Sequence, residues 1–295
     1  MALIDHHAFA SAAKPRAFPP ALKDPRWFQI IALSALLAMG ASMRAFEVSP
    51  ADVLTLFTVS LALQWAMSMI FAIRFDPKSA LITALSLSLL LRAEGVIPLA
   101  AAAGIAIGSK FMIRFRGKHI FNPANIGIVA VTLMTTDAWT TPGQWGTALW
   151  LAALIAGAGC FVCHRAARLD VPLIFLGAFA ALLFARALWL GDPLMIPMLR
   201  LQNGALILFA FFMISDPKTT PDGFALRAVF AVAIAIIAYI LTYQFFLPDA
   251  IFYALAIVCA VRPLIELFDE AKPYQWGDRP APRARNRKPE LTPAE

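Results

Sequence analysis

The feature that most constrains this chain is a succession of ten apolar runs, each bounded by proline, glycine or charged residues. Hydrophobic residues form 60% of the sequence and charged residues 15%, whereas soluble domains carry roughly 45–50% apolar and 25% charged residues. A soluble core cannot hide so much apolar surface. The sequence therefore predicts an all-α integral membrane protein, with the lipid bilayer as its solvent.

The ten runs differ in length. They lie at roughly residues 27–43, 51–73, 79–91, 96–109, 122–136, 145–163, 171–190, 203–215, 224–243 and 249–268. A helix that crosses the bilayer needs about 20 apolar residues, and the third, fourth, fifth and eighth runs have only about 13 to 15. We expect several half-length, broken helices, whose ends can meet a ligand at membrane depth. Short spans in a locally thinned bilayer are the alternative.

The distribution of positive charge favours about ten transmembrane helices. With both termini in the cytoplasm, the inner segments carry nearly all of the 25 Lys and Arg residues, as the positive-inside rule requires. The exceptions are Arg44, Arg92, Arg186 and Arg200. Omitting any one central span would spoil this alternation. We therefore predict a multi-pass protein of the bacterial inner (cytoplasmic) membrane with both termini cytoplasmic.

These spans divide the chain into three parts. We expect a cytoplasmic N-terminal segment over residues 1–26, a transmembrane domain over 27–268 and a cytoplasmic tail rich in Pro and Arg over 269–295. The net charge of +7 is explained by this topology and by attraction to anionic lipid. Membrane lipid is thus an expected partner, and nucleic acid is not.

A spacing in the sequence suggests two related halves. Asp-Pro-Lys occurs at 76–78 and again at 216–218, an offset of 140, and Pro123 and Pro263 stand at the same offset. This pattern predicts two halves of five helices each. An odd number of spans per half would insert the second half upside down and place the two motifs on opposite faces. The charge distribution places both motifs inside, and we follow the charge distribution.

Two asparagines stand at the start of the fifth apolar run, in "KHIFNPANIG". Pro123 suits the first turn of a helix, which makes Asn122 a natural N-cap. Asn125 lies three residues further on, so the two amides would face the same way on a helix. They would offer donors and acceptors to a planar heterocycle beside a positive helix end. Capping alone and ligand binding both remain open from the residues.

Three stretches of the chain resemble a known family. "KHIFNPANIG", "SALITALSLSLLL" and "FFMISDPKTTP" are similar to motifs of the NqrB/RnfD family of membrane flavoproteins. That family comprises the B subunit of the sodium-pumping NADH:quinone reductase and the D subunit of the Rnf complex. The likeness runs over roughly residues 50–268, and a compact stand-alone, UnbU-like branch looks closer still.

The resemblance implies a non-covalent flavin, in particular riboflavin and otherwise FMN, near the cytoplasmic side. The family's contacts carry over to Asn122, Asn125 and Asp216. Phe212 would stack on the flavin ring, and Lys118 would stabilise the reduced anionic ring. The implied function is a flavin-binding membrane subunit that relays electrons between a partner redox protein and a quinone or second carrier. Other subunits of a redox complex are then expected partners.

The chain departs from the family at the covalent flavin site. The family links FMN to a threonine in a Ser/Thr-Gly-Ala-Thr motif, and the nearest sequence here is Gly146-Thr147-Ala148. Thr147 lacks the neighbours of that motif, so we expect no covalent FMN on it. Electron transfer across the whole membrane by this chain alone is therefore in doubt.

Other chemistry finds little support in the sequence. "CFVCH" at 160–164 matches a haem-attachment pattern, but it lies at the inner end of a span, where small buried residues explain it. No catalytic residues and no metal site are expected. The main alternative function is a permease for a small aromatic molecule such as a flavin or natural product. A third interpretation is an assembly scaffold that kept the fold and lost the cofactor.

Overall fold

The computed structural model describes residues 24–42, 48–268, 271 and 274. These residues form a helical bundle with two small antiparallel sheets. The helices are α1 (Pro25–Ser42), α2 (Pro50–Ile70), α3 (Lys78–Leu90), α4 (Val96–Met112), α5 (Pro123–Met134), α6 (Leu149–Arg165), α7 (Asp170–Leu190), α8 (Met195–Leu201), α9 (Gly204–Phe212), α10 (Phe224–Tyr243) and α11 (Ala250–Ile265). Short 3-10 helices cover Pro142–Trp145 and Glu266–Phe268.

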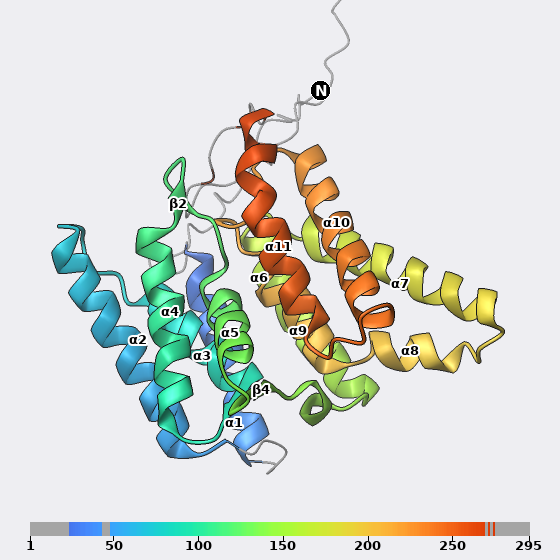
Figure 1. The fold of residues 1–295 in the computed structure, drawn as a ribbon, viewed down its shortest axis with the longest axis horizontal. Coiled ribbons are helices and arrows are strands. Elements are labelled where there is room, and N and C mark those ends of the chain that lie inside the picture. Colours follow the sequence, from blue (N-terminus) through green and yellow to red (C-terminus); the bar gives the residue numbers. More distant parts are fainter. Residues whose placement is uncertain (1–23, 43–47, 269–270, 272–273, 275–295) are drawn as a thin grey trace, which may run out of the picture.

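The two sheets lie at opposite ends of the bundle (Figure 1). Strand β1 (Leu91–Ala93) pairs with β4 (Ala138–Thr140), and Arg92 lies opposite Trp139. Strand β2 (Arg114–Phe115) pairs with β3 (Lys118–His119) in a tight hairpin. The β1–β4 sheet joins the α3–α4 connection to the segment that follows α5, and the β2–β3 hairpin lies between α4 and α5.

Each of the ten predicted apolar runs corresponds to a helix. The prediction missed α8, a short helix that precedes α9 and is bent from it by 48°. Among the described residues, three helices, α2, α7 and α10, are long and apolar enough to cross a membrane, and the bent pair α8–α9 would make a fourth. The apolar helices α3, α4, α5, α6 and α11 are shorter. A mostly helical protein with several candidate membrane spans is therefore confirmed.

Two short helices form the centre of the bundle. Every residue of α9 is buried, and α3 is buried without interruption from Thr83 to Leu90. A helix that is buried on all sides needs neighbours on all sides. Helices α1, α2, α4 and α5 pack around α3, and α6 and α7 pack on α9 (Figure 1).

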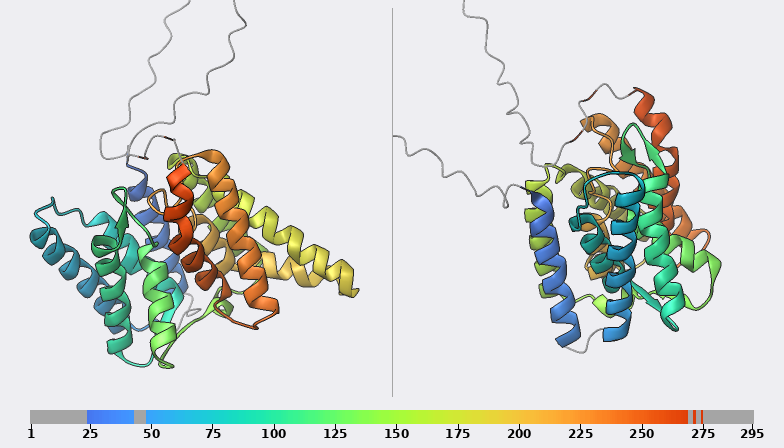
Figure 2. Two further views of the ribbon diagram at one scale, coloured as in Figure 1. Left: turned by 45° about the horizontal axis from the view of Figure 1, so that its top comes forward. Right: turned by 90° about the vertical axis from the view of Figure 1, so that its left-hand side faces the viewer.

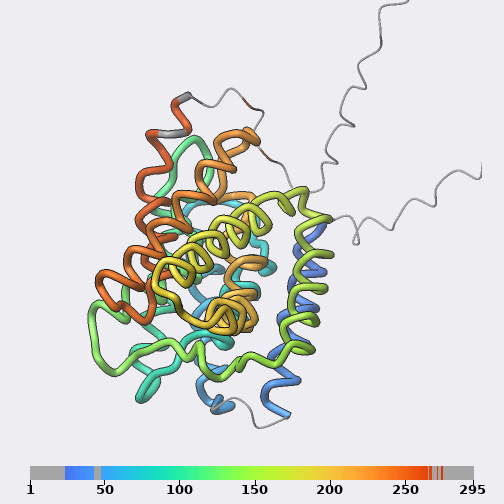
Figure 3. Tube along the Cα trace, turned by 90° about the vertical axis from the view of Figure 1, so that its right-hand side faces the viewer, coloured from blue at the N-terminus to red at the C-terminus, as the bar shows by residue number. Residues whose placement is uncertain are grey.

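The packing of the first five helices recurs in the rest of the chain. Helix α1 packs on α3, α2 on α4 and α4 on α5; in the same order, α6 packs on α9, α7 on α10 and α10 on α11. The two sets meet where α1 lies beside α6 (Figure 3) and α5 beside α11.

Helices α4 and α5 approach each other closely because small residues line their contact. Ala102, Ala103 and Ala106 of α4 are fully buried. A Cβ atom added to Gly127 of α5 would lie 2.6 Å from the Ala102 carbonyl oxygen. Small residues commonly permit such close approach between membrane helices. Glycine at 127 therefore fixes the position of α5 and of the chain that precedes it.

We expect Gly127→Ala to lower stability by about 1–3 kcal/mol, because the new methyl group has no room. The measurement is the melting temperature of the purified protein in detergent. The matched control is Gly108→Ala on α4, where an added Cβ meets nothing within 4 Å. Equal melting temperatures for the two variants would contradict the close contact.

Candidate functional site

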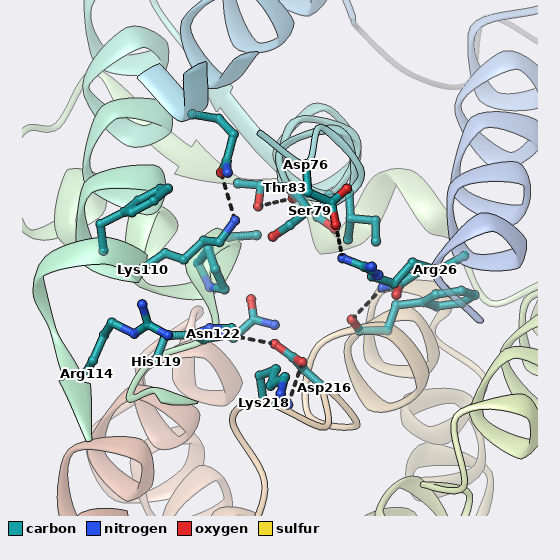
Figure 4. A pocket seen from close by; sticks show the side chains of 18 of the residues that line it. Arg26, Asp76, Ser79, Thr83, Lys110, Arg114, His119, Asn122, Asp216 and Lys218 are labelled. Carbon is teal, nitrogen blue, oxygen red and sulfur yellow. Dashed lines mark hydrogen bonds and ion pairs between the residues drawn. The ribbon is translucent and has the colours of Figure 1, made fainter. Parts of the chain in front are cut away.

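A cavity of about 290 Å³ lies where α3 and α5 begin and α9 ends (Figure 4). Segments from both halves of the sequence contribute to its wall. The lining residues are Arg26, Gln29, Gln64, Ile73, Arg74, Asp76, Ser79, Ile82, Thr83, Ser86, Lys110, Phe111, Arg114, Gly117, His119, Asn122, Pro123, Ala124, Phe212, Asp216 and Lys218. Three of the five predicted site residues, Asn122, Phe212 and Asp216, are among them.

Asn122 caps α5, as the sequence predicts. Its backbone is extended (φ −63°, ψ 125°), and its side-chain oxygen accepts a hydrogen bond from the Asn125 N–H at 3.1 Å. Its Nδ2 donates to the Met213 carbonyl at 3.3 Å. An amide has two N–H donors and two acceptor lone pairs. These two bonds therefore leave one donor and one acceptor of Asn122 for a ligand.

Both Asp-Pro-Lys motifs face this one cavity. Asp76 accepts a hydrogen bond from the Lys78 N–H at 3.2 Å, and Asp216 accepts one from the Lys218 N–H at 2.9 Å. The first motif leads into α3, whereas the second follows α9. The motifs thus share a side of the molecule, as the charge distribution predicts. They do not occupy equivalent positions in the two sets of helices. A shift of 140 residues therefore does not match each helix of the first set with its counterpart in the second.

Helix α3 presents a polar face to the cavity. Ser79, Thr83 and Ser86 all line it, and Thr83 and Ser86 are nearly fully buried. Their spacing of four and then three residues places them on one side of a helix. This pattern is visible in "KSALITALSLSLL" and is the sequence signal that was missed.

Opposite this face, Lys110 at the end of α4 donates to Gln64 of α2 at 2.7 Å. Gln64 is only 3% exposed, so its amide is committed to this bond inside the bundle. Phe212, at the end of α9, supplies an apolar wall and is itself buried. Neither Lys110 nor Gln64 was predicted as a site residue.

Two predicted contacts lie outside the cavity lining. Asn125 is 1% exposed, and its Nδ2 donates to the Phe252 carbonyl of α11 at 3.0 Å. Spacing rules for helices misplace this side chain, because Asn122 is an extended cap and not yet part of the helix. Asn125 therefore ties α5 to α11.

Lys118 is the other predicted contact that the cavity lacks. It is 5% exposed and lies 3.0 Å from Asp222 and 3.1 Å from Glu266. The hairpin turn at Arg116 and Gly117, both with positive φ, points Lys118 toward this pair of carboxylates. Figure 2 shows the hairpin beside the C-terminal end of α11. Lys118 thus fastens the hairpin to the neighbouring loop and helix.

Asp216 is charged despite its burial. Burial by itself raises the pKa of this carboxyl, but hydrogen bonds with His119 and the Lys218 N–H, and the charge of Lys118, outweigh it. The pKa of Asp216 therefore lies below its usual value. His119 Nε2 is 3.2 Å from the carboxylate. A carboxyl with a depressed pKa stabilises the fold above its unfolded pKa, and this contribution is lost as the pH falls through the folded pKa.

Asp216→Asn keeps the acceptor for the Lys218 N–H but removes the charge. At pH 7 we expect the variant to be less stable than the parent by about 2 kcal/mol. The gap in melting temperature should narrow below pH of about 4, where the unfolded parent protein binds a proton on this carboxyl. A gap that stays constant from pH 7 to pH 3 would contradict a charged Asp216.

A second cavity, of about 530 Å³, contains Thr147 in its wall. Arg200 and Asn203 also line it, and Asn203 caps α9 through the Ala205 and Leu206 N–H groups. This cavity does not share a lining residue with the first. The structure thus separates Thr147 from Asn122, Phe212 and Asp216.

The "CFVCH" stretch forms the end of α6. Cys163 is buried and its thiol lies 3.0 Å from the Phe211 carbonyl, whereas His164 is exposed. Within the described residues, no group of three or more His, Cys, Asp or Glu side chains could hold a metal ion. Packing accounts for the position of Cys163.

Comparison with known proteins gives a partial match. Residues 133–275 match the model of the NQR2, RnfD, RnfE family. The D subunit of an ion-translocating oxidoreductase complex from Psychromonas ingrahamii is 31% identical over 135 residues, covering 44% of this chain and 38% of the relative. The corresponding D subunits of Escherichia coli O1:K1 / APEC and O9:H4 (strain HS) are 28% and 29% identical over 131 and 133 residues, covering 44% of this chain and 36% of each relative.

The chain therefore matches well under half the length of these relatives. The resemblance to the family is confirmed, and the region matched by the family model contains Phe212 and Asp216. The stretch with Asn122 lies before this region.

Proposed function

We propose that this chain is a flavin-binding membrane subunit of an electron-transport system, because residues 133–275 match the model of the NQR2, RnfD, RnfE family. It relays electrons between a partner redox protein and a quinone or second carrier. The relatives are named as subunits of an ion-translocating oxidoreductase complex. Other subunits of a redox complex are accordingly its proposed partners.

One observation carries this proposal. Asn122, Phe212 and Asp216 come from segments up to 94 residues apart, yet they line a single cavity. The cavity combines an apolar wall with amide and hydroxyl groups, which is the usual makeup of a cofactor site. Its volume of about 290 Å³ is at the small end of ligand pockets. The residues present therefore fit a single aromatic ring system with a polar edge.

The protein's part in the chemistry is to position the ring and to set the charge around it. A bound flavin supplies one-electron and two-electron redox chemistry. The free donor and acceptor of Asn122 would hold the polar edge of the ring, and Phe212 would supply an apolar contact for it. The positive end of α5 and the ammonium of Lys110 favour negative charge in the cavity. Asn125 and Lys118 stay predicted contacts of the flavin, and both also hold α5 and the β2–β3 hairpin in place.

We also propose ten membrane spans with both termini in the cytoplasm. The recurrent packing of α1–α5 and α6–α11 supports two halves of opposite orientation. Helix α3 starts and helix α9 ends at the same cavity, as expected if the chain runs in opposite directions through the two halves. The five shorter helices then cross only part of the bilayer or span a thinner region of it.

A matched pair of cap variants tests the flavin proposal. Asn122→Ser keeps an oxygen that can cap α5 but removes the amide donor. Asn203→Ser makes the same change at the cap of α9, which lines the second cavity. The protein is purified from its native membrane, and the flavin is identified by mass spectrometry after denaturing extraction.

We expect the parent protein to show the yellow, reductant-bleachable absorbance of a flavin. Asn122→Ser should lower its affinity about tenfold, because one hydrogen bond to the ring is lost, while Asn203→Ser leaves it unchanged. A lower flavin affinity in Asn203→Ser, with no change in Asn122→Ser, would place the flavin in the second cavity and overturn the assignment. Absence of any flavin from the parent protein, combined with uptake of flavin by liposomes that contain it, would favour a permease.

A further inference from the structure

Among the residues that the structure describes, more cations than carboxylates line the cavity. Five cations line it, Arg26, Arg74, Lys110, Arg114 and Lys218, against two carboxylates, Asp76 and Asp216. Both carboxylates are already engaged. Asp76 lies 2.7 Å from Arg26, and Asp216 lies 3.2 Å from His119.

Of the other four cations, three donate hydrogen bonds to neutral groups. Lys110 donates to the Gln64 amide oxygen at 2.7 Å, Arg114 to the Gly117 carbonyl at 2.7 Å and Lys218 to the Tyr274 carbonyl at 2.9 Å. Arg74 is exposed. Across residues 24–42, 48–268, 271 and 274, none of the four forms an ion pair. A partly buried ammonium such as Lys110 without a counter-charge is unfavourable.

Two of these four cations lie together on one side of the cavity. Lys110 and Arg114 approach it from the end of α4 and the strand that follows, whereas Arg26 lies on the far side (Figure 4). The N-terminus of α5 adds partial positive charge to the cavity wall. The cavity thus has one side where an anion can meet Lys110 and Arg114, and another side where Arg26 and Asp76 pair with each other.

Resting on the proposed function, we infer that this cavity selects a phosphorylated flavin over riboflavin. Lys110 and Arg114 hold the phosphate, while Asn122 and Phe212 contact the ring. A dianionic phosphate supplies the counter-charge that Lys110 lacks, and charge-assisted hydrogen bonds to phosphate are stronger than neutral ones. The resemblance to the family implies riboflavin near this place, so the charge of the cavity departs from that expectation.

The test compares FMN with riboflavin on the same flavin-free protein in detergent, by quenching of flavin fluorescence. We expect FMN to bind at least about tenfold more tightly than riboflavin. Lys110→Gln and Arg114→Gln should each weaken FMN binding about tenfold and weaken the binding of oxidised riboflavin, which has no phosphate, much less. Lys110→Arg should retain the preference for FMN over riboflavin, and added salt should weaken only the binding of FMN. The control is Arg200→Gln, which removes a cation from the wall of the second cavity.

Each outcome has a distinct meaning. Equal affinity for the two flavins overturns the inference and leaves the proposed function standing, whereas failure of both to bind contradicts the proposed function. Weaker FMN binding in Arg200→Gln, with no change in Lys110→Gln or Arg114→Gln, also overturns the inference. Inorganic phosphate and a short-chain phosphatidylglycerol serve as competitors. A phospholipid that displaces FMN far better than inorganic phosphate would assign these cations to a lipid headgroup, against the inference.

Discussion

The architecture depends on the need to satisfy the ends of short helices inside the protein. A helix leaves unpaired N–H groups at its start, and lipid offers them no partners. The side chains of Asn122 and Asn203 cap α5 and α9, and Asp76 accepts from the first residue of α3. Polar side chains must therefore stand where the short helices begin. The candidate cavity is found at two of those places, the starts of α3 and α5.

Buried ion pairs then hold the surrounding loops in position. Arg262 is fully buried, donates to the Lys218 and His119 carbonyls and lies 3.5 Å from Glu266. Lys118 joins the same carboxylate to Asp222. Removing one partner from such a buried set leaves an uncompensated charge. The hairpin, the end of α11 and the loop after α9 consequently form one unit, and that unit carries His119 and Asp216 to the cavity.

The sequence was sufficient for the helical segments and for the cap at Asn122, because hydrophobic runs, Pro123 and the cap residue are local signals. It could not place Asn125 and Lys118, since their positions depend on contacts with Phe252, Asp222 and Glu266, more than 100 residues away. Lys110 was not predicted as a site residue for a related reason. Its role follows from the approach of α2 and α4, which no pattern within either helix encodes.

The placement of the two Asp-Pro-Lys turns has a consequence for comparing the halves of this chain. One turn opens a helix and the other follows the end of a helix, yet both reach the same cavity. An alignment that superposed the motifs would match the beginning of α3 with residues beyond α9, and so would pair helices that do not correspond in their packing. A superposition that begins from α3 and α9 themselves would instead bring Asp76 near Asn203, and would pair the first cavity with the second.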